Sequence, residues 1–305
     1  MSPPLHIQIA IATGSFNPSL TFGSESPGGG GDFIADTYSN AYAGYSVRKI
    51  RSEYEGSAIR VRIDGSTEEQ DIGFDSSGNL DQLSLTSFVG SGTGLVSKWY
   101  DQIGSNDAVQ TSASEQPMIF DAGTIVTINN KPAIQFDGED DDFHNVFNAG
   151  GQTDMAFFSV SSIDSTPLVV GDRAAIFGRY VIYNRFTNSS THSEYKGSLE
   201  GQIKNASPAQ NYNQRATLGG ASEPIRSLGT MINAGGTFKV RFNGTESAGV
   251  STEMTGQQSQ TIYIGSRSTE HLDGHMQELL VYFNDQSENV PGIESNMNSY
   301  YSVHL

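Results

Sequence analysis

The sequence predicts an all-β fold, a two-sheet antiparallel sandwich with a few short helices and an extended N-terminal arm. The chain of 305 residues contains 34 Gly, 13 Tyr and 16 Phe, and only 17% of its residues are charged. Many glycines and aromatic residues with few charges suit short strands joined by tight turns. From about residue 95 onward, short strand-like segments follow one another, and Gly, Asn or Asp separates most of them. This regular spacing favours a sandwich or barrel over a helical fold.

Residues 1–31 are predicted to form the arm, and residues 32–305 the sandwich. Isoleucines alternate with other residues between positions 5 and 12, the period-two pattern of a strand with one buried face. Pro27 and four glycines follow, which predicts a linker with almost no side chain to pack. A short strand isolated in this way needs a partner, either its own sandwich or another chain, and we favour another chain. Its predicted anchoring side chains are Ile7, Ile9, Ile11 and Phe16.

Within the body, the spacing of apolar residues predicts a few helices among the strands. Residues 40–54 have helical spacing, and a short helical turn is expected over 81–89 with Asp81 as its cap. A closing amphipathic helix with Ser287 as its cap is predicted near the C-terminus. Asn-Gly at 243–244, directly after a strand pattern, predicts a hairpin turn.

Composition excludes several classes of function. The net charge of −17 would repel phosphate backbones and anionic membrane surfaces, so we expect no nucleic-acid partner. No cysteine is present, which rules out disulfides and thiolate metal sites. The first residues lack a basic region and their apolar run is broken by His6 and Gln8, so we expect no signal peptide. No stretch approaches the roughly 18 apolar residues of a membrane-spanning helix.

Three motifs are distinctive: Tyr-Asp-Gln-Ile-Gly-Ser at 100–105, Phe-Asp-Gly-Glu-Asp-Asp at 136–141, and Gly-His-Met-Gln-Glu-Leu at 274–279. With the segments around them, they resemble concanavalin-like (laminin-G-like) jelly rolls, in particular the sandwich of arabinofuranosidase-B-type enzymes. The chain is also similar to phage-encoded structural and fibre proteins that share these motifs. The resemblance covers most of residues 42–303 and implies a jelly roll. It is specific for fold and weak for function, because one fold hosts many activities.

The resemblance also allows the enzyme hypothesis to be examined. A retaining glycosidase needs two carboxylates about 5 to 5.5 Å apart. In the resembled family, the nucleophile Glu follows a Cys-Cys pair and a Phe-Asp-Tyr-Gly-Asn-Ala-Glu run, whereas the comparable residues 174–186 here contain neither Cys nor carboxylate. The family's acid/base Asp follows an Ile-Gly-Gly turn, and the corresponding turn here is Ile264, Gly265, Ser266 and Arg267. Both catalytic groups are therefore expected to be absent, although another pair among 34 acidic residues remains open.

Several residues are candidates for carbohydrate binding, because such sites combine an aromatic ring with polar side chains that bind hydroxyl groups. Trp99 next to Tyr100 is either a sugar platform or a core residue, and we favour the core. The polar residues after it either bind sugar or satisfy turn backbone groups. A later Tyr- and Arg-rich segment suits a ligand or subunit contact. The full candidate set is Trp99, Asp101, Asn106, Asp107, Arg179, Tyr183 and Glu278.

The densest acidic cluster follows Gly138. Hard oxygen ligands in a loop suit Ca²⁺, although the spacing does not match the helix–loop–helix calcium pattern. A solvated acidic turn is the favoured interpretation, with calcium as the alternative cofactor. The metal candidates are Glu139, Asp140, Asp141 and Asp142.

Together these observations predict a non-catalytic structural protein of a bacteriophage virion, such as a head fibre, decoration or tail-associated subunit. The arm would bind other virion proteins by strand pairing, and the lectin-like sandwich would face host-surface glycans. We expect a symmetric homo-oligomer, for example a trimer. The alternatives are a glycoside hydrolase of arabinofuranosidase type and a free lectin module.

Overall fold

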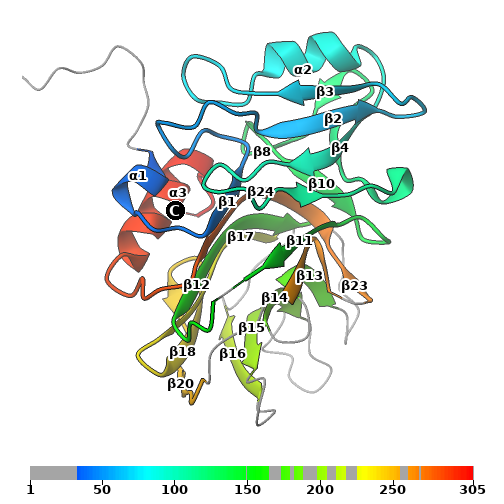
Figure 1. The fold of residues 1–305 in the computed structure, drawn as a ribbon. Helices are drawn as coiled ribbons and strands as arrows, with labels where there is room; N and C mark the ends of the chain where they lie inside the picture. Colours follow the sequence, from blue (N-terminus) through cyan, green and yellow to red (C-terminus); the bar gives the residue numbers. More distant parts are fainter. Residues whose placement is uncertain are drawn as a thin grey trace, which may run out of the picture.

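The computed structural model shows a two-layer β-sandwich with helices on its outside (Figure 1). It describes residues 33–148, 150–164, 173–178, 182–187, 198–204, 211–217, 225–254, 260–267 and 269–304. The predicted all-β class is confirmed, because nearly every strand pairing is antiparallel and the described helices are short. The predicted anchoring residues of the arm lie outside the described residues, so the arm stays a prediction.

The first layer has β24 at its centre. Its strands are β18 (Thr237–Phe242), β17 (Ile225–Ala234), β12 (Met155–Ile163), β24 (Asp273–Tyr282), β1 (Ala43–Ser46) and β10 (Ile134–Asp137). β12 pairs with β24 along one edge and with β17 along the other. β1 and β10 share the remaining edge of β24, one after the other. All but one of the residues of β24 are buried, since sheet neighbours and helices cover both of its faces.

The second layer is longer and more curved. Its strands, in sheet order, are β16 (Asn211–Thr217), β15 (Ser198–Lys204), β14 (Ile182–Thr187), β13 (Arg173–Gly178), β21 (Gln260–Ile264), β11 (Phe143–Phe147), β5 (Ala108–Val109), β4 (Gly94–Trp99), β2 (Ile59–Ile63) and β3 (Glu69–Ile72). β6 (Met118–Asp121) pairs with both β4 and β10, so it connects the two layers at one end.

Short strands complete the sheet edges and turns. They are β7 (Thr124–Ile125), β8 (Thr127–Ile128), β9 (Lys131–Pro132), β19 (Thr245–Glu246), β20 (Val250–Ser251), β22 (Ser266–Arg267) and β23 (Glu270–His271). Asn243 and Gly244 both have positive φ between β18 and β19, as the two central residues of a tight hairpin require, so the predicted turn is confirmed.

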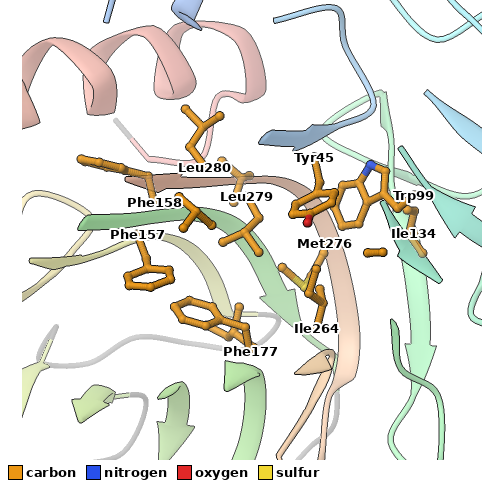
Figure 2. Close-up of a cluster of buried hydrophobic side chains, with 14 of the residues drawn as sticks. Tyr45, Trp99, Ile134, Phe157, Phe158, Phe177, Ile264, Met276, Leu279 and Leu280 are labelled. Carbon is orange, nitrogen blue, oxygen red and sulfur yellow. The ribbon is translucent and has the colours of Figure 1, made fainter. Parts of the chain in front are cut away.

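The apolar core lies between the two layers. Phe157 of β12 stacks on Phe177 of β13 with ring centroids 5.0 Å apart. Met276 and Leu279 of β24 point toward the same interior (Figure 2). Gly201 of β15 is also fixed by this packing, because a Cβ there would lie 2.6 Å from a methyl carbon of Val240. Such close packing makes even small volume changes in the core costly.

Three α-helices occur in the described part of the chain: α1 (Ile34–Thr37), α2 (Gln82–Val89) and α3 (Val290–Tyr301). Asp81 caps α2 by accepting a hydrogen bond from the Ser84 N–H, as predicted. The closing helix is confirmed as α3, but Asn289 rather than Ser287 occupies its N-cap position. The side chain of Ser287 instead donates to Asp285 in the preceding turn.

The predicted helix over residues 40–54 is wrong. This segment runs as strand β1 along β24, where Ala43 pairs with Val281 and Ser46 pairs with Glu278. All four residues of β1 are buried, so both faces of the strand are covered. The helical spacing of its apolar residues arises from burial on both faces, and tertiary pairing overrides the local pattern.

A buried ion pair joins β24 to the segment after β1 and to α3. Arg48 donates from Nε and Nη2 to the two oxygens of Glu278 at 2.7 and 2.9 Å, and the Glu278 side chain has no exposed surface. Ser46 and Tyr301 also donate to Glu278, at 2.8 and 3.0 Å. Burial alone would lower the pKa of the Arg48 guanidinium, but Glu278 raises this pKa above its ordinary value.

Within the described chain, no helix is long and apolar enough to cross a membrane.

Removing one partner of this pair is expected to be strongly destabilising. Glu278→Ala leaves Arg48 buried without its counter-ion and should lower the free energy of unfolding by about 3 to 5 kcal/mol. Arg48→Met combined with Glu278→Leu should recover most of that loss, because no unpaired charge remains. Urea denaturation followed by fluorescence measures both variants. A loss below about 1 kcal/mol in Glu278→Ala would contradict the structural role assigned to the pair.

Candidate functional site

Trp99 lies in the core and not on a binding surface. Its side chain has no exposed surface, and its ring packs beside Tyr45 and Phe143 at centroid distances of 5.9 and 6.2 Å. Trp99 is therefore a core residue and not a sugar platform, since a ligand cannot reach its ring. The indole is inward because Trp99 alternates with Lys98 along β4.

Asp101 organises the turn that follows. One carboxylate oxygen accepts the N–H groups of Gly44 and Ile103, each at 2.9 Å, and the other accepts those of Gly104 and Asn106 at 3.1 and 3.0 Å. Only 2% of the residue is exposed. Asp101 is thus a turn residue with little capacity left for a ligand.

The remaining polar residues of this turn have structural contacts too. Asp107 accepts the Asp101 N–H at 3.1 Å and forms an ion pair with Lys98 at 3.3 Å. Asn106 accepts the hydroxyl of Tyr42 on its amide oxygen. Glu278, another sugar candidate, is corrected as well, because it is buried in the ion pair with Arg48. Arg179 lies outside the described residues, and only the backbone of Tyr183, in β14, is described.

The acidic loop brings together a slightly different set of carboxylates from the one predicted. Oxygens of Asp137, Asp140 and Asp141 lie within 4.8 Å of one another, a spacing that could serve a cation. Asp137 replaces Glu139 in this group, because its side chain folds over the turn and accepts the N–H of Glu139 at 2.8 Å. These three residues could supply part of the six to eight oxygens that Ca²⁺ takes, although Asp137 and Asp141 already accept loop N–H groups.

Asp142 belongs to a different cluster, next to the end of β21. Its carboxylate accepts the Ser266 hydroxyl and the Gln110 amide, both at 2.8 Å. The imidazole of His144 lies 4.0 Å away, and the His144 side chain is 40% exposed. The His144 ring faces that of Tyr263, with centroids 6.1 Å apart. A carboxylate, a histidine and a tyrosine thus lie together on a partly exposed surface, which suits hydrogen bonding to a polar ligand.

Burial raises the pKa of Asp142 above its ordinary value, while the Ser266 hydroxyl and the nearby histidines oppose the shift. The effect is larger for Asp141, where burial and the charges of Asp137 and Asp140 raise the pKa to about 7. Raised carboxyl pKa values occur at functional sites and also in crowded acidic loops, so geometry has to decide between them.

The two segments that correspond to the nucleophile and the acid/base residue of the resembled enzymes carry no carboxylate. The described side chains of β13 are Ala175, Ile176, Phe177 and Gly178, all buried. In the turn after β21, Ser266 is 2% exposed and bonded to Asp142, and Arg267 forms an ion pair with Glu270 at 3.2 Å. Asp142, whose carboxylate bonds to this turn through Ser266, comes from a different segment of the chain.

A single register row crosses the whole second layer. Each position is the direct antiparallel partner of the next. Arg60, Lys98, His144 and Tyr263 in the row each have a fully buried chain neighbour, so these four side chains point away from the core. We call it the cross-sheet row, and its members are Asp71, Arg60, Lys98, Val109, His144, Tyr263, Gly178, Tyr183, Gln202 and Asn213.

Sequence reasoning missed most of these positions. Tyr183 was the only member proposed as a site residue, and the others are spread along the chain from Arg60 to Tyr263. The alternation of His144 between buried Phe143 and half-buried Asn145 is a signal that it faces solvent. No signal in one sequence could give the register that aligns it with Tyr263.

Comparison with known proteins gives similarity of fold. No family model matches the sequence, and no curated protein matches it. Among solved structures, an arabinofuranosidase complexed with arabinofuranosyl-α-1,2-xylobiose has a TM-score of 0.62 and 13% identity over 87% of this chain. A GH54 α-L-arabinofuranosidase soaked with a cyclic sulfate inhibitor has a TM-score of 0.67 and 12% identity over 89% of this chain. This chain spans 64% and 65% of those two proteins. The described sandwich is therefore similar in fold to part of each of these two arabinofuranosidases.

The raised pKa of Asp141 predicts a pH-dependent stability. A carboxyl whose folded-state pKa exceeds its unfolded value binds its proton more tightly when folded, so stability falls as pH rises from about 4 to about 7. Asp141→Asn removes this cost, and its Tm should exceed that of the wild type by about 2 °C at pH 8. The difference should narrow as the pH falls and close near pH 4, below the unfolded-state pKa. Glu139→Gln, at the exposed neighbour, is the control. Equal melting curves at pH 8 for wild type and Asp141→Asn would contradict the assignment.

Proposed function

We propose that this chain is a non-catalytic glycan-binding subunit of a bacteriophage particle. The observation that carries the proposal is an arabinofuranosidase fold in which the resembled catalytic positions lack carboxylates. Ser266 and Arg267 occupy the turn of the acid/base Asp, and the described side chains of β13 are apolar or absent. A sandwich of this kind keeps a surface for sugar while lacking the pair of groups that cleave it.

The glycan-binding part of the proposal is supported by the partly exposed surface over β11 and β21. His144 and Tyr263 provide ring surfaces, and Asp142 lies next to them with its pKa raised. Sugars present apolar ring faces and many hydroxyl groups, so aromatic rings with hydrogen-bonding neighbours suit them. The net charge of −17 disfavours nucleic acid as the ligand.

The virion part of the proposal is supported by the sequence of the arm and by the resemblance to phage fibre proteins. Isoleucines alternate between positions 5 and 12, ahead of a linker of Pro27 and four glycines, which suits strand pairing with another subunit. The sandwich would then project outward from the particle toward host-surface glycans. A symmetric homo-oligomer with other virion proteins as partners is part of the same proposal.

Binding without turnover is the central test. The full chain should bind at least one neutral polysaccharide on a glycan array, with or without Ca²⁺. It should release no product from 4-nitrophenyl α-L-arabinofuranoside or from the bound polysaccharide. Failure to bind any glycan would reject the proposal.

A second candidate function, glycoside hydrolysis, is favoured by one observation. Asp142 bonds to Ser266 of the acid/base turn, and its raised pKa suits a proton donor. Turnover that disappears in Asp142→Asn but persists in Asp121→Asn, a substitution at an exposed residue of β6, would establish the hydrolase and overturn the non-catalytic proposal. Turnover in neither variant nor wild type would reject the hydrolase.

The arm is tested by particle incorporation. Deletion of residues 1–31 should prevent incorporation, and replacement of Ile7, Ile9 and Ile11 by Ser should do the same, because the apolar face of the strand is lost. Substitution of His6 and Gln8, on the other face, is the matched control and should leave incorporation unchanged. Normal incorporation of the deleted chain, measured by quantitative blotting of purified particles, would disprove the anchor.

A further inference from the structure

We infer that the glycan is a neutral, extended chain that lies across the strands of the second layer, along the part of the cross-sheet row between Val109 and Asn213. This inference rests on the proposed function and names the site and the ligand class. The segment concerned runs from Val109 through His144, Tyr263, Gly178 and Gln202 to Asn213. Tyr183 occupies the register position between Gly178 and Gln202.

The segment is continuous because every step is a direct antiparallel pair. Directly opposed residues of an antiparallel pair lie on the same face of a sheet, about 4.5 to 5.5 Å apart. The row therefore presents its positions in line, although they come from seven strands. With about 4.8 Å between neighbouring strands, the segment extends for about 29 Å along the sheet. That length suits an oligosaccharide or polysaccharide better than a single sugar.

The chemistry of the segment changes along its length in a way that suits sugar. His144 and Tyr263 form an aromatic pair near one end, where Val146 of the same strand is 56% exposed. Gly178 is buried and places no side chain in the row, so a ligand would rest on the side chains on either side of this position. At the far end, the Gln202 amide donates to that of Asn213, and both residues have exposed surface. Rings for the apolar faces of sugars are thus followed by amides for their hydroxyl groups.

Charge along the row favours a neutral ligand. The segment from Val109 to Asn213 contains neither a carboxylate nor a Lys or Arg side chain. The row's two cations lie at its other end and are already paired, Arg60 with Asp71 at 2.7 Å and Lys98 with Asp107 at 3.3 Å. In the adjacent register line, Arg215 is paired with Glu200 at 2.7 Å. With a net charge of −17 around it, this surface would repel polyanions and accept uncharged chains.

The test uses affinity electrophoresis and calorimetry on the full chain. The neutral probes are arabinoxylan, laminarin and dextran, and the anionic probes are polygalacturonate and heparin. His144→Ala, Tyr263→Ala and Gln202→Ala should each weaken binding to the recognised neutral probe by about fivefold or more. Tyr263→Phe should stay within about twofold of the wild type, because the ring remains. Gln82→Ala, at an exposed residue of α2, is the matched control for Gln202→Ala and should have no effect.

Melting curves establish that each variant folds before its binding is compared. Affinity that rises with oligosaccharide length supports an extended site, whereas full affinity for a monosaccharide overturns it. Neutral-glycan binding that all three alanine variants retain overturns the inference and leaves the proposed function standing. Stronger binding to polygalacturonate or heparin than to any neutral probe overturns the assigned ligand class. Absence of binding to every probe and to a glycan array rejects the proposed function and this inference together.

Discussion

The buried pair of Arg48 and Glu278 is the interaction on which the arrangement of the first layer depends. Glu278 lies on the central strand, Arg48 follows the strand at its edge, and Tyr301 and Asn296 of the closing helix bind the same two side chains. Two buried charges cost desolvation energy that only good geometry and further hydrogen bonds offset. Here the two-point contact of the guanidinium supplies the geometry, and the hydroxyl groups of Ser46 and Tyr301 supply the further hydrogen bonds. The pair therefore acts chiefly as a positional constraint, which holds the segment after β1 and helix α3 against β24.

Much of the fold follows from local patterns, and the failures have a common cause. Asp81, the Asn243–Gly244 turn and the closing helix were predictable, because capping and tight turns depend on residues close in sequence. The segment around Ala43 was wrongly predicted as a helix, because burial on both sides of a strand removes the period-two signal. Strands β15 and β16, which pair with each other, were not predicted, since the alternation of apolar residues in them is weak.

The candidate site was harder to predict than the fold. Residue types that suit sugar or metal were found easily, but Trp99 and Glu278 lie inside the molecule. Exposure depends on what the rest of the chain places over a residue, which a single sequence does not encode in any short motif. Conversely, His144 and Tyr263 are ordinary residues in the sequence and become neighbours only through the pairing of β11 with β21. The absence of carboxylates from the resembled enzyme positions was visible from sequence, because that comparison required only alignment of motifs.

One irregularity in β24 separates two chemically different environments. Val160 of β12 pairs with Glu278 and Ser161 pairs with Met276, so Gln277 is an extra residue in the ladder. Its amide donates to three carbonyl groups of the nearby turn, those of Ile128, Lys131 and Pro132. Because side chains alternate in a strand, this single insertion changes the parity of everything that precedes it. Loss of one residue here would turn Met276 out of the core and carry His275 into it. Loops can therefore vary in length, whereas a deletion at position 277 would exchange the buried apolar face of β24 with its polar face.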